Sequence, residues 1–201
     1  MNYLIDDFPY EINEIPIDTD YRRMVQFELL MLDDKIPVSD KIILSINLLY
    51  KEPVPDLEKA WDGLLWYYSG GEIFQDNKDD TTSSTGIHQR AYDFEVDNER
   101  IYTAFIKEYG IDLQKTPLHW WTFKSLLFAI PDTNPMGKIM YYRTVDVSTL
   151  KGDELKHALK IRSMFPVEKF EKLTKKQKEA KYLSKIEKRR KEIEQQMKER
   201  G

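Results

Sequence analysis

Apolar residues recur at three- and four-residue steps in the first seventy residues, which is the spacing that places them on one face of an α-helix. The spacing predicts three short helices joined by tight turns. Their apolar faces are Met24, Phe27, Leu30 and Met31; Ile42, Ile43, Ile46 and Leu49; and Leu57, Trp61, Leu64, Leu65 and Tyr68. Thr19, Ser39 and Asp56 are expected to cap them, because their side-chain oxygens accept from free backbone N–H groups. Gly70-Gly71 is expected to end the third helix in a left-handed conformation.

The segments on either side of this block have a different pattern. Residues 1–17 alternate partly between apolar and polar positions and contain prolines, so a short strand or an arm strapped to the body fits equally well. Residues 75–90 contain almost no large apolar side chain and are rich in Asp, Thr and Ser. Such a segment contributes nothing to a core and is predicted to be a mobile loop or an interdomain linker.

A second helical block covers residues 91–166. A helix capped by Asp97 is expected to end at Gly110, and Thr116-Pro117 has the cap–proline pattern that starts the next one. Asn134-Pro135 repeats this pattern for a short helix that reaches Arg143. A further helix is expected from Asp153 to Phe165. The predicted inward residues are Ile101, Phe105 and Tyr109; Trp120, Phe123, Leu127 and Ile130; and Leu155, Leu159 and Ile161.

Residues 167–201 are highly charged, and their acidic residues precede basic ones by four positions, as in Glu187/Lys191 and Glu194/Lys198. Such pairs stabilise a helix by roughly 0.2–0.5 kcal/mol each. A helix is therefore expected over Thr174–Arg200. Its apolar residues fall on a seam with alternating three- and four-residue steps, which Arg190 interrupts: Leu183, Ile186, Ile193 and Met197.

These patterns predict a mainly α protein, with a compact multi-helix body, an extended N-terminal segment and a long charged C-terminal helix. The expected parts are an N-terminal helical part at 1–74, a mobile polar linker at 75–90, an aromatic-rich helical part at 91–166 and a charged C-terminal helix at 167–201.

Charge is distributed unevenly along the chain. Residues 1–90 carry 18 acidic and 8 basic groups, residues 91–166 carry 10 of each, and residues 167–201 carry 7 acidic and 13 basic groups. An acidic head and a basic tail predict two different partners or head-to-tail contact. The chain has no basic start followed by an apolar run and no stretch of about 18 apolar residues, so we expect a soluble, unexported protein.

The usual signatures of enzymes are missing from the sequence. There is no phosphate-binding Gly-rich loop, no His-Glu-x-x-His and no Gly-x-Ser-x-Gly. The chain has no cysteine, and His88, His119 and His157 are far apart. Asp93, Glu95, Asp97 and Glu99 alternate, but the sixth and twelfth positions of a calcium loop are not Gly and Glu. The protein is expected to be non-enzymatic, with no cofactor and no metal.

Two short strings favour protein binding. His119-Trp120-Trp121 places two tryptophans about 100° apart on a helix. Either both pack against the preceding helix, or one lines a groove that binds an amphipathic helix of a partner. Lys188-Arg189-Arg190-Lys191 is basic, but Glu187, Glu192, Glu194 and Glu199 lie nearby. A salt-bridged helix that docks on a partner is therefore favoured over a nucleic-acid-binding one.

The middle of the chain resembles a known family. Tyr92-Asp93-Phe94-Glu95, Ile101-Tyr102, Tyr109-Gly110-Ile111-Asp112-Leu113, Leu118-His119-Trp120-Trp121 and Met140-Tyr141-Tyr142-Arg143-Thr144 carry the resemblance. They are similar to the bacteriophage gene-product-15 family of siphophages and prophages of Gram-positive bacteria. The resemblance runs from the N-terminal helices to about residue 165 and is most specific over residues 92–143.

The resemblance implies a role in phage tail morphogenesis. Family members are encoded beside the tape-measure gene, which implies a tail assembly chaperone. Such a protein binds the tape-measure protein and the tail tube protein in the bacterial host cytoplasm and is absent from the mature virion. A homo-oligomer is compatible with this role. A structural minor tail component and, further off, a nucleic-acid-binding regulator stay open. The candidate partner-binding residues are Tyr92, Phe94, His119, Trp120, Trp121, Phe123, Tyr142, Arg143, Lys188, Arg189, Arg190 and Lys191.

Overall fold

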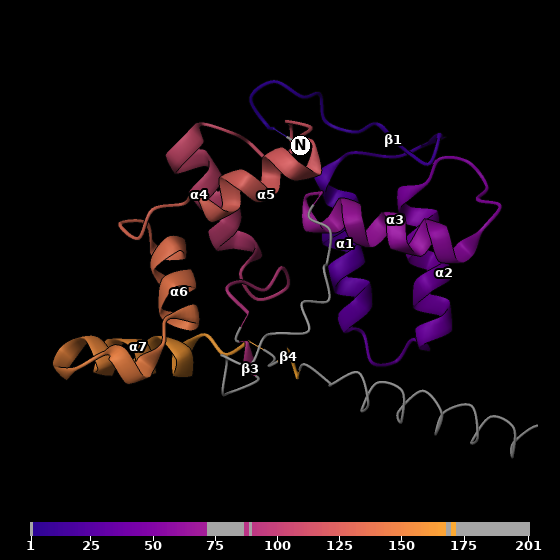
Figure 1. Cartoon of the computed structure of the whole chain (residues 1–201). Coiled ribbons are helices and arrows are strands. Elements are labelled where there is room, and N and C mark those ends of the chain that lie inside the picture. Colours follow the sequence, from indigo (N-terminus) through magenta and orange to yellow (C-terminus); the bar gives the residue numbers. More distant parts are fainter. Residues whose placement is uncertain (1, 72–86, 89, 168–169, 172–201) are drawn as a thin grey trace, which may run out of the picture. The chain divides into compact units, whose positions relative to one another are not determined.

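The computed structural model describes residues 2–71, 87–88, 90–167 and 170–171 (Figure 1). The chain divides into two compact units, residues 1–80 with 90–167 and residues 81–89 with 168–201. The described residues of the second unit are two short antiparallel strands, β3 (Ile87–His88) and β4 (Phe170–Glu171).

The first unit is mainly helical, as predicted. It begins with the antiparallel strands β1 (Glu11–Ile12) and β2 (Ile15–Pro16). The helices are α1 (Tyr21–Leu32), α2 (Val38–Leu49), α3 (Leu57–Ser69), α4 (Asn98–Tyr109), α5 (Trp120–Phe128), α6 (Pro135–Thr144), the 3₁₀ turn η1 (Val147–Thr149) and α7 (Gly152–Met164). Each of these described helices is too short or too polar to cross a bilayer.

The predicted extended N-terminal segment contains a hairpin. Asn13 and Glu14 form its turn with φ values of 52° and 65°. Two consecutive left-handed residues make the kind of turn whose twist matches that of a two-stranded ribbon. The hairpin brings Ile12 and Ile17 into the core, where both are buried.

The two predicted helical parts share one core. Helix α1 contacts α2 and α5, α2 contacts α3, and α4 contacts α5 and α6. The ring of Phe123 in α5 stacks against Tyr21 of α1 at 4.3 Å, Phe105 of α4 at 5.0 Å and Trp120 at 5.8 Å between centroids. Aromatic burial therefore joins helices from both parts of the sequence.

Several predicted helix ends are confirmed. The Asp56 carboxylate accepts from the backbone N–H groups of Glu58 and Lys59, and Asn134 caps α6 through Met136. Gly70 and Gly110 end α3 and α4 in the left-handed conformation, with φ of 90° and 66°.

Two predicted caps are wrong by one or two residues. Helix α1 is capped by Asp20 rather than Thr19, because the Asp20 carboxylate accepts from the backbone of Arg22. Helix α2 starts at Val38, after Pro37, so Ser39 lies inside the first turn. There the carbonyl of Pro37 accepts from the backbone N–H of Asp40 and of Lys41.

The predicted start of the next helix at Thr116-Pro117 is also wrong, since α5 begins at Trp120. The backbone N–H of Tyr21 donates to the Leu118 carbonyl, and that of Trp120 donates to the Thr19 carbonyl. This long-range pairing holds residues 118–119 in an extended conformation, so α5 begins three residues after Pro117.

Some predicted inward residues are exposed instead. Ile43 is 48% exposed, since α2 buries the face that carries Lys41, Ser45, Ile46 and Leu49. Leu159 is 53% exposed, and Ala158 is the buried residue of α7. Phe170–Glu171 is a strand rather than part of the charged helix. The predicted helix over Thr174–Arg200 and most of the 75–90 linker lie outside the described residues.

Candidate partner-binding site

The two adjacent tryptophans are both core residues, with 0% exposure. The indole N–H of Trp120 donates to the Tyr68 carbonyl at 3.0 Å, and that of Trp121 donates to the Tyr67 carbonyl at 2.7 Å. Because these carbonyls are consecutive at the end of α3, side chains 100° apart on α5 both reach them. Of the two alternatives that the sequence left open, packing of both tryptophans in the interior is therefore correct, and a groove lined by one of them is not.

Other side chains complete this contact. The last carbonyls of a helix have no partner within it and need donors from elsewhere. Lys124 Nζ donates to the Ser69 carbonyl, and Tyr3 Oη donates to the Gly70 carbonyl at 3.1 Å. A Cβ on Gly71 would come within 2.9 Å of the Trp121 ring, so glycine allows the close approach. We call this set of contacts the tryptophan lock between α5 and α3.

His119 positions the lock rather than facing a partner. Its Nδ1 accepts from the backbone N–H of Trp121 at 3.1 Å and so caps α5. With Nδ1 as an acceptor, the neutral ring carries its proton on Nε2, which lies 3.2 Å from the Pro9 carbonyl. Burial lowers the pKa of His119, with a smaller opposing effect from the Pro9 carbonyl.

Tyr92 belongs to a buried polar cluster. Its hydroxyl donates to Glu28 Oε1 at 2.8 Å, and the Tyr68 hydroxyl donates to the same oxygen at 2.6 Å. Arg90 pairs with Glu28 at 2.8 Å and with Asp93 at 3.0 Å. Burial raises the pKa of Tyr92, and the Glu28 carboxylate raises it further, so the phenol remains a donor. The cluster holds residues 90–93 against α1 and α3.

Arg143 forms a second buried ion pair. Its side chain is fully buried and makes a bidentate contact with Asp97, whose carboxylate is also inaccessible. The guanidinium donates in addition to the Ala91 carbonyl at 3.2 Å and the Phe165 carbonyl at 3.1 Å. Arg143 therefore ties α6 to the start of α4 and the end of α7.

The remaining predicted candidates are placed as follows. Phe94 and Phe123 are buried, and Tyr142 is half-buried. Lys188, Arg189, Arg190 and Lys191 lie outside the described residues. The structure brings most of the aromatic candidates together, but as an internal core and not as a contact surface.

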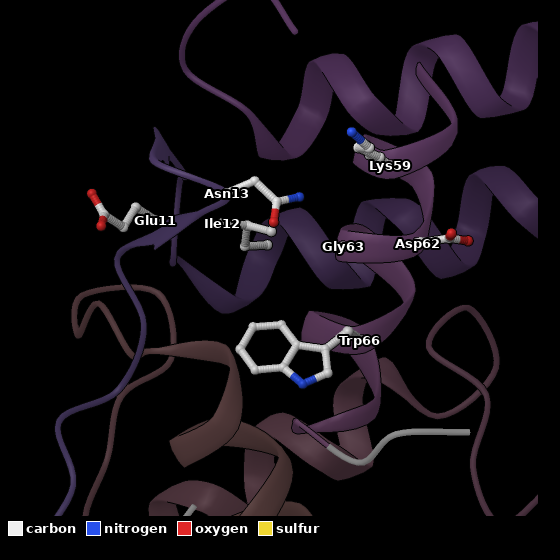
Figure 2. A pocket seen from close by; sticks show the side chains of 7 residues that line it. All are labelled: Glu11, Ile12, Asn13, Lys59, Asp62, Gly63 and Trp66. Atoms are coloured by element: carbon white, nitrogen blue, oxygen red, sulfur yellow. The ribbon is translucent and has the colours of Figure 1, made fainter. Parts of the chain in front are cut away.

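The described surface is hollowed between the hairpin and α3, a feature that sequence patterns did not indicate. The hollow has a volume of about 470 Å³ and is lined by Glu11, Ile12, Asn13, Lys59, Asp62, Gly63 and Trp66. Figure 2 shows the Trp66 indole projecting from α3 toward the side of the hairpin, with the Glu11 and Asp62 carboxylates pointing away on opposite sides. Gly63 lets the hairpin approach α3 closely, because a Cβ there would lie 2.6 Å from Ile12 Cγ2.

The lining of the hollow combines one aromatic ring with carboxylates and a lysine. No nucleophile and base meet in this lining. Among the described residues, His, Asp and Glu form no group of three that could hold a metal ion. Asn13 is of a residue type that adopts the left-handed conformation more readily than most, which is a local signal for a turn, but nothing local indicated that the turn lies against α3.

Comparisons with known proteins give one family. The family model described as Bacteriophage Gp15 protein matches residues 2–166. Neither the curated proteins nor the solved structures contain a match to the chain. The match covers the described helical body from the N-terminal turn to the end of α7. The chain therefore belongs to the Bacteriophage Gp15 protein family.

Proposed function

We propose that this protein is a phage tail assembly chaperone that binds the tape-measure protein and tail tube subunits during tail morphogenesis. The observation that carries the proposal is the family match over residues 2–166, which points to a phage structural or morphogenesis protein. In this role the protein acts by binding, without catalysis or a cofactor, in the cytoplasm of the bacterial host.

The physical character of the body supports a binding role. Two buried ion pairs and the tryptophan lock fix its helices, so little ordering is needed when a partner binds. The Trp66 hollow offers one aromatic contact site for a projecting side chain. A tape-measure protein is long and helical, and it exposes apolar stripes before assembly. Many weak and repeated contacts of this kind add up to stable coverage of such a protein.

The test is co-purification with the neighbouring gene products. The tagged protein is expressed with the tape-measure and tail tube proteins of the same phage, and mass spectrometry identifies what is recovered. The proposal predicts recovery of soluble tape-measure protein. If the hollow binds the partner, Trp66→Ala recovers less tape-measure protein than the unchanged chain. Trp61→Ala on the same helix also loses a partly buried aromatic residue and serves as the control that recovers it normally.

The composition of purified virions separates this proposal from the alternative of a minor tail component. A chaperone is present in infected cells and missing from mature particles. Failure to recover either partner, together with stoichiometric presence in virions, would replace the proposal with the structural role.

A further inference from the structure

The N-terminal turn displays two adjacent aliphatic side chains to solvent. Leu4 is 91% exposed and Ile5 is 80% exposed, the highest values among the large apolar residues that the structure describes. The turn itself is closed by hydrogen bonds. The backbone N–H groups of Ile5 and Asp6 donate to the Asn2 carbonyl at 3.1 and 2.9 Å, and that of Asn2 donates to the Asp6 carboxylate at 2.6 Å.

This turn is anchored to the body. The Tyr3 ring stacks on Trp121 with an interplanar angle of 4° and 5.8 Å between centroids. The Phe8 ring packs 5.6 Å from Trp121 and 4.8 Å from His119. Tyr3 and Phe8 thus bind inward while Leu4 and Ile5 face outward. Two exposed aliphatic residues on a fixed turn form a preorganised contact surface for a partner, because their backbone is already ordered before binding.

The surroundings of the turn are acidic. Residues 1–21 contain six acidic and no basic residues. Asp18 and Asp20 pair with Arg23 and Arg22, whereas Asp6, Asp7, Glu11 and Glu14 are all exposed. A complementary partner therefore carries an apolar stripe flanked by lysine or arginine.

The chain itself contains such a sequence. Residues 172–201 hold twelve basic and five acidic residues around the seam Leu183, Ile186, Ile193 and Met197. We propose that the Leu4–Ile5 turn of one copy binds the 183–197 seam of a second copy, so that the protein associates head to tail. A contact between two different surfaces generates open chains or rings rather than a closed two-fold dimer. This inference goes beyond the proposed function and does not depend on tape-measure binding.

Sedimentation velocity of the full chain over a range of concentrations tests the proposal. The unchanged protein forms species larger than a monomer as its concentration rises. The head variant Leu4→Asn/Ile5→Asn and the tail variant Ile186→Asn/Ile193→Asn each associate roughly tenfold to a hundredfold more weakly, because each loses the burial of two aliphatic side chains. The matched control Leu57→Asn/Leu159→Asn, whose two leucines are each 53% exposed, associates like the unchanged protein.

Mixing the two variants gives the sharpest outcome. The head variant keeps an intact tail and the tail variant keeps an intact head, so an equimolar mixture forms a one-to-one dimer that does not grow further. Raising the salt concentration weakens the association of this dimer, since charged residues flank the contact. A monomeric unchanged protein, a control as weak as the head variant, or a mixture that stays monomeric would each overturn the inference.

Discussion

At the scale of single residues, the described interior holds charged groups only where each has a partner. Glu28 and Asp93 pair with Arg90, Asp97 pairs with Arg143, and Lys41 donates to the Met31 carbonyl. Removing one member of a buried pair leaves an uncompensated charge, which costs far more than the pair contributes.

Arg143→Met is therefore expected to lower the free energy of unfolding by about 3–5 kcal/mol. It removes the bidentate partner of the buried Asp97 carboxylate, which keeps the Asp93 N–H at 2.9 Å and the more distant Arg100, and it takes a donor from the Ala91 and Phe165 carbonyls. Urea denaturation measures the loss. Arg100→Met is the matched control, because Arg100 lies 3.7 Å from the same carboxylate but is 37% exposed, and it should cost less than about 1 kcal/mol. Equal losses in the two variants would contradict this account of the buried pair.

His119 predicts a pH dependence of stability. Burial lowers its pKa from the ordinary value of 6.5, so the unfolded chain takes up a proton before the folded chain does. Stability contributed by neutral His119 is present above pH 6.5 and is lost as the pH falls from there through the lowered folded-state pKa. Protonation at Nδ1 also removes the acceptor that caps α5.

The measurement is urea denaturation between pH 8 and pH 5, compared with His119→Asn. Asparagine can still cap the helix but does not titrate in this range. The unchanged protein should lose more stability on acidification than the variant. Parallel pH profiles would show that His119 does not titrate in the way the structure indicates.

At the scale of elements, the tryptophan lock fixes α5 against the end of α3. Trp120→Phe and Trp121→Phe keep an aromatic ring but remove the donors to the Tyr68 and Tyr67 carbonyls. Each is expected to cost about 0.5–1.5 kcal/mol, the net contribution of one hydrogen bond, because the Tyr67 carbonyl still accepts from the Gly70 N–H and the Tyr68 carbonyl from Lys124 Nζ. Thermal or urea denaturation measures the cost.

Trp66→Phe is the control for the lock. Its ring lines the hollow and packs edge-on against Trp121 at 5.5 Å between centroids, and no hydrogen bond of its indole N–H occurs within the described parts of the chain, so the substitution changes the size of the ring without removing a hydrogen bond. Near-equal stability of all three phenylalanine variants would mean that the two hydrogen bonds do not stabilise the contact.

Local signals predicted the elements better than their contacts. Several helix caps were predicted well because a cap depends only on residues within one helical turn. Two helices start where expected, after Asp56 and Asn134, and two end where expected, at Gly70 and Gly110. The start of α5 depends on backbone pairing with Thr19 and Tyr21, about a hundred residues away, which no local pattern encodes.

At the scale of the whole molecule, local sequence patterns also failed to predict the candidate site, because they do not encode contacts between distant segments. Tryptophans, an arginine and tyrosines suggest a binding surface by composition, but burial decides their role, and burial depends on packing between distant segments. The surfaces that the structure offers instead, the Trp66 hollow and the Leu4–Ile5 turn, are built by the N-terminal residues lying over α3 and α5. Family membership was predictable because short strings over residues 92–143 carry it.

The chaperone role can be tested by the solubility of the tape-measure protein. The tape-measure protein is produced in bacteria alone, with this protein, and with an unrelated helical protein of similar size, and its soluble fraction is measured after centrifugation. If this protein is the chaperone, the tape-measure protein is soluble only when this protein is present, and the two elute together in size-exclusion chromatography. A soluble fraction that this protein does not change, with separate elution of the two, would contradict the chaperone role.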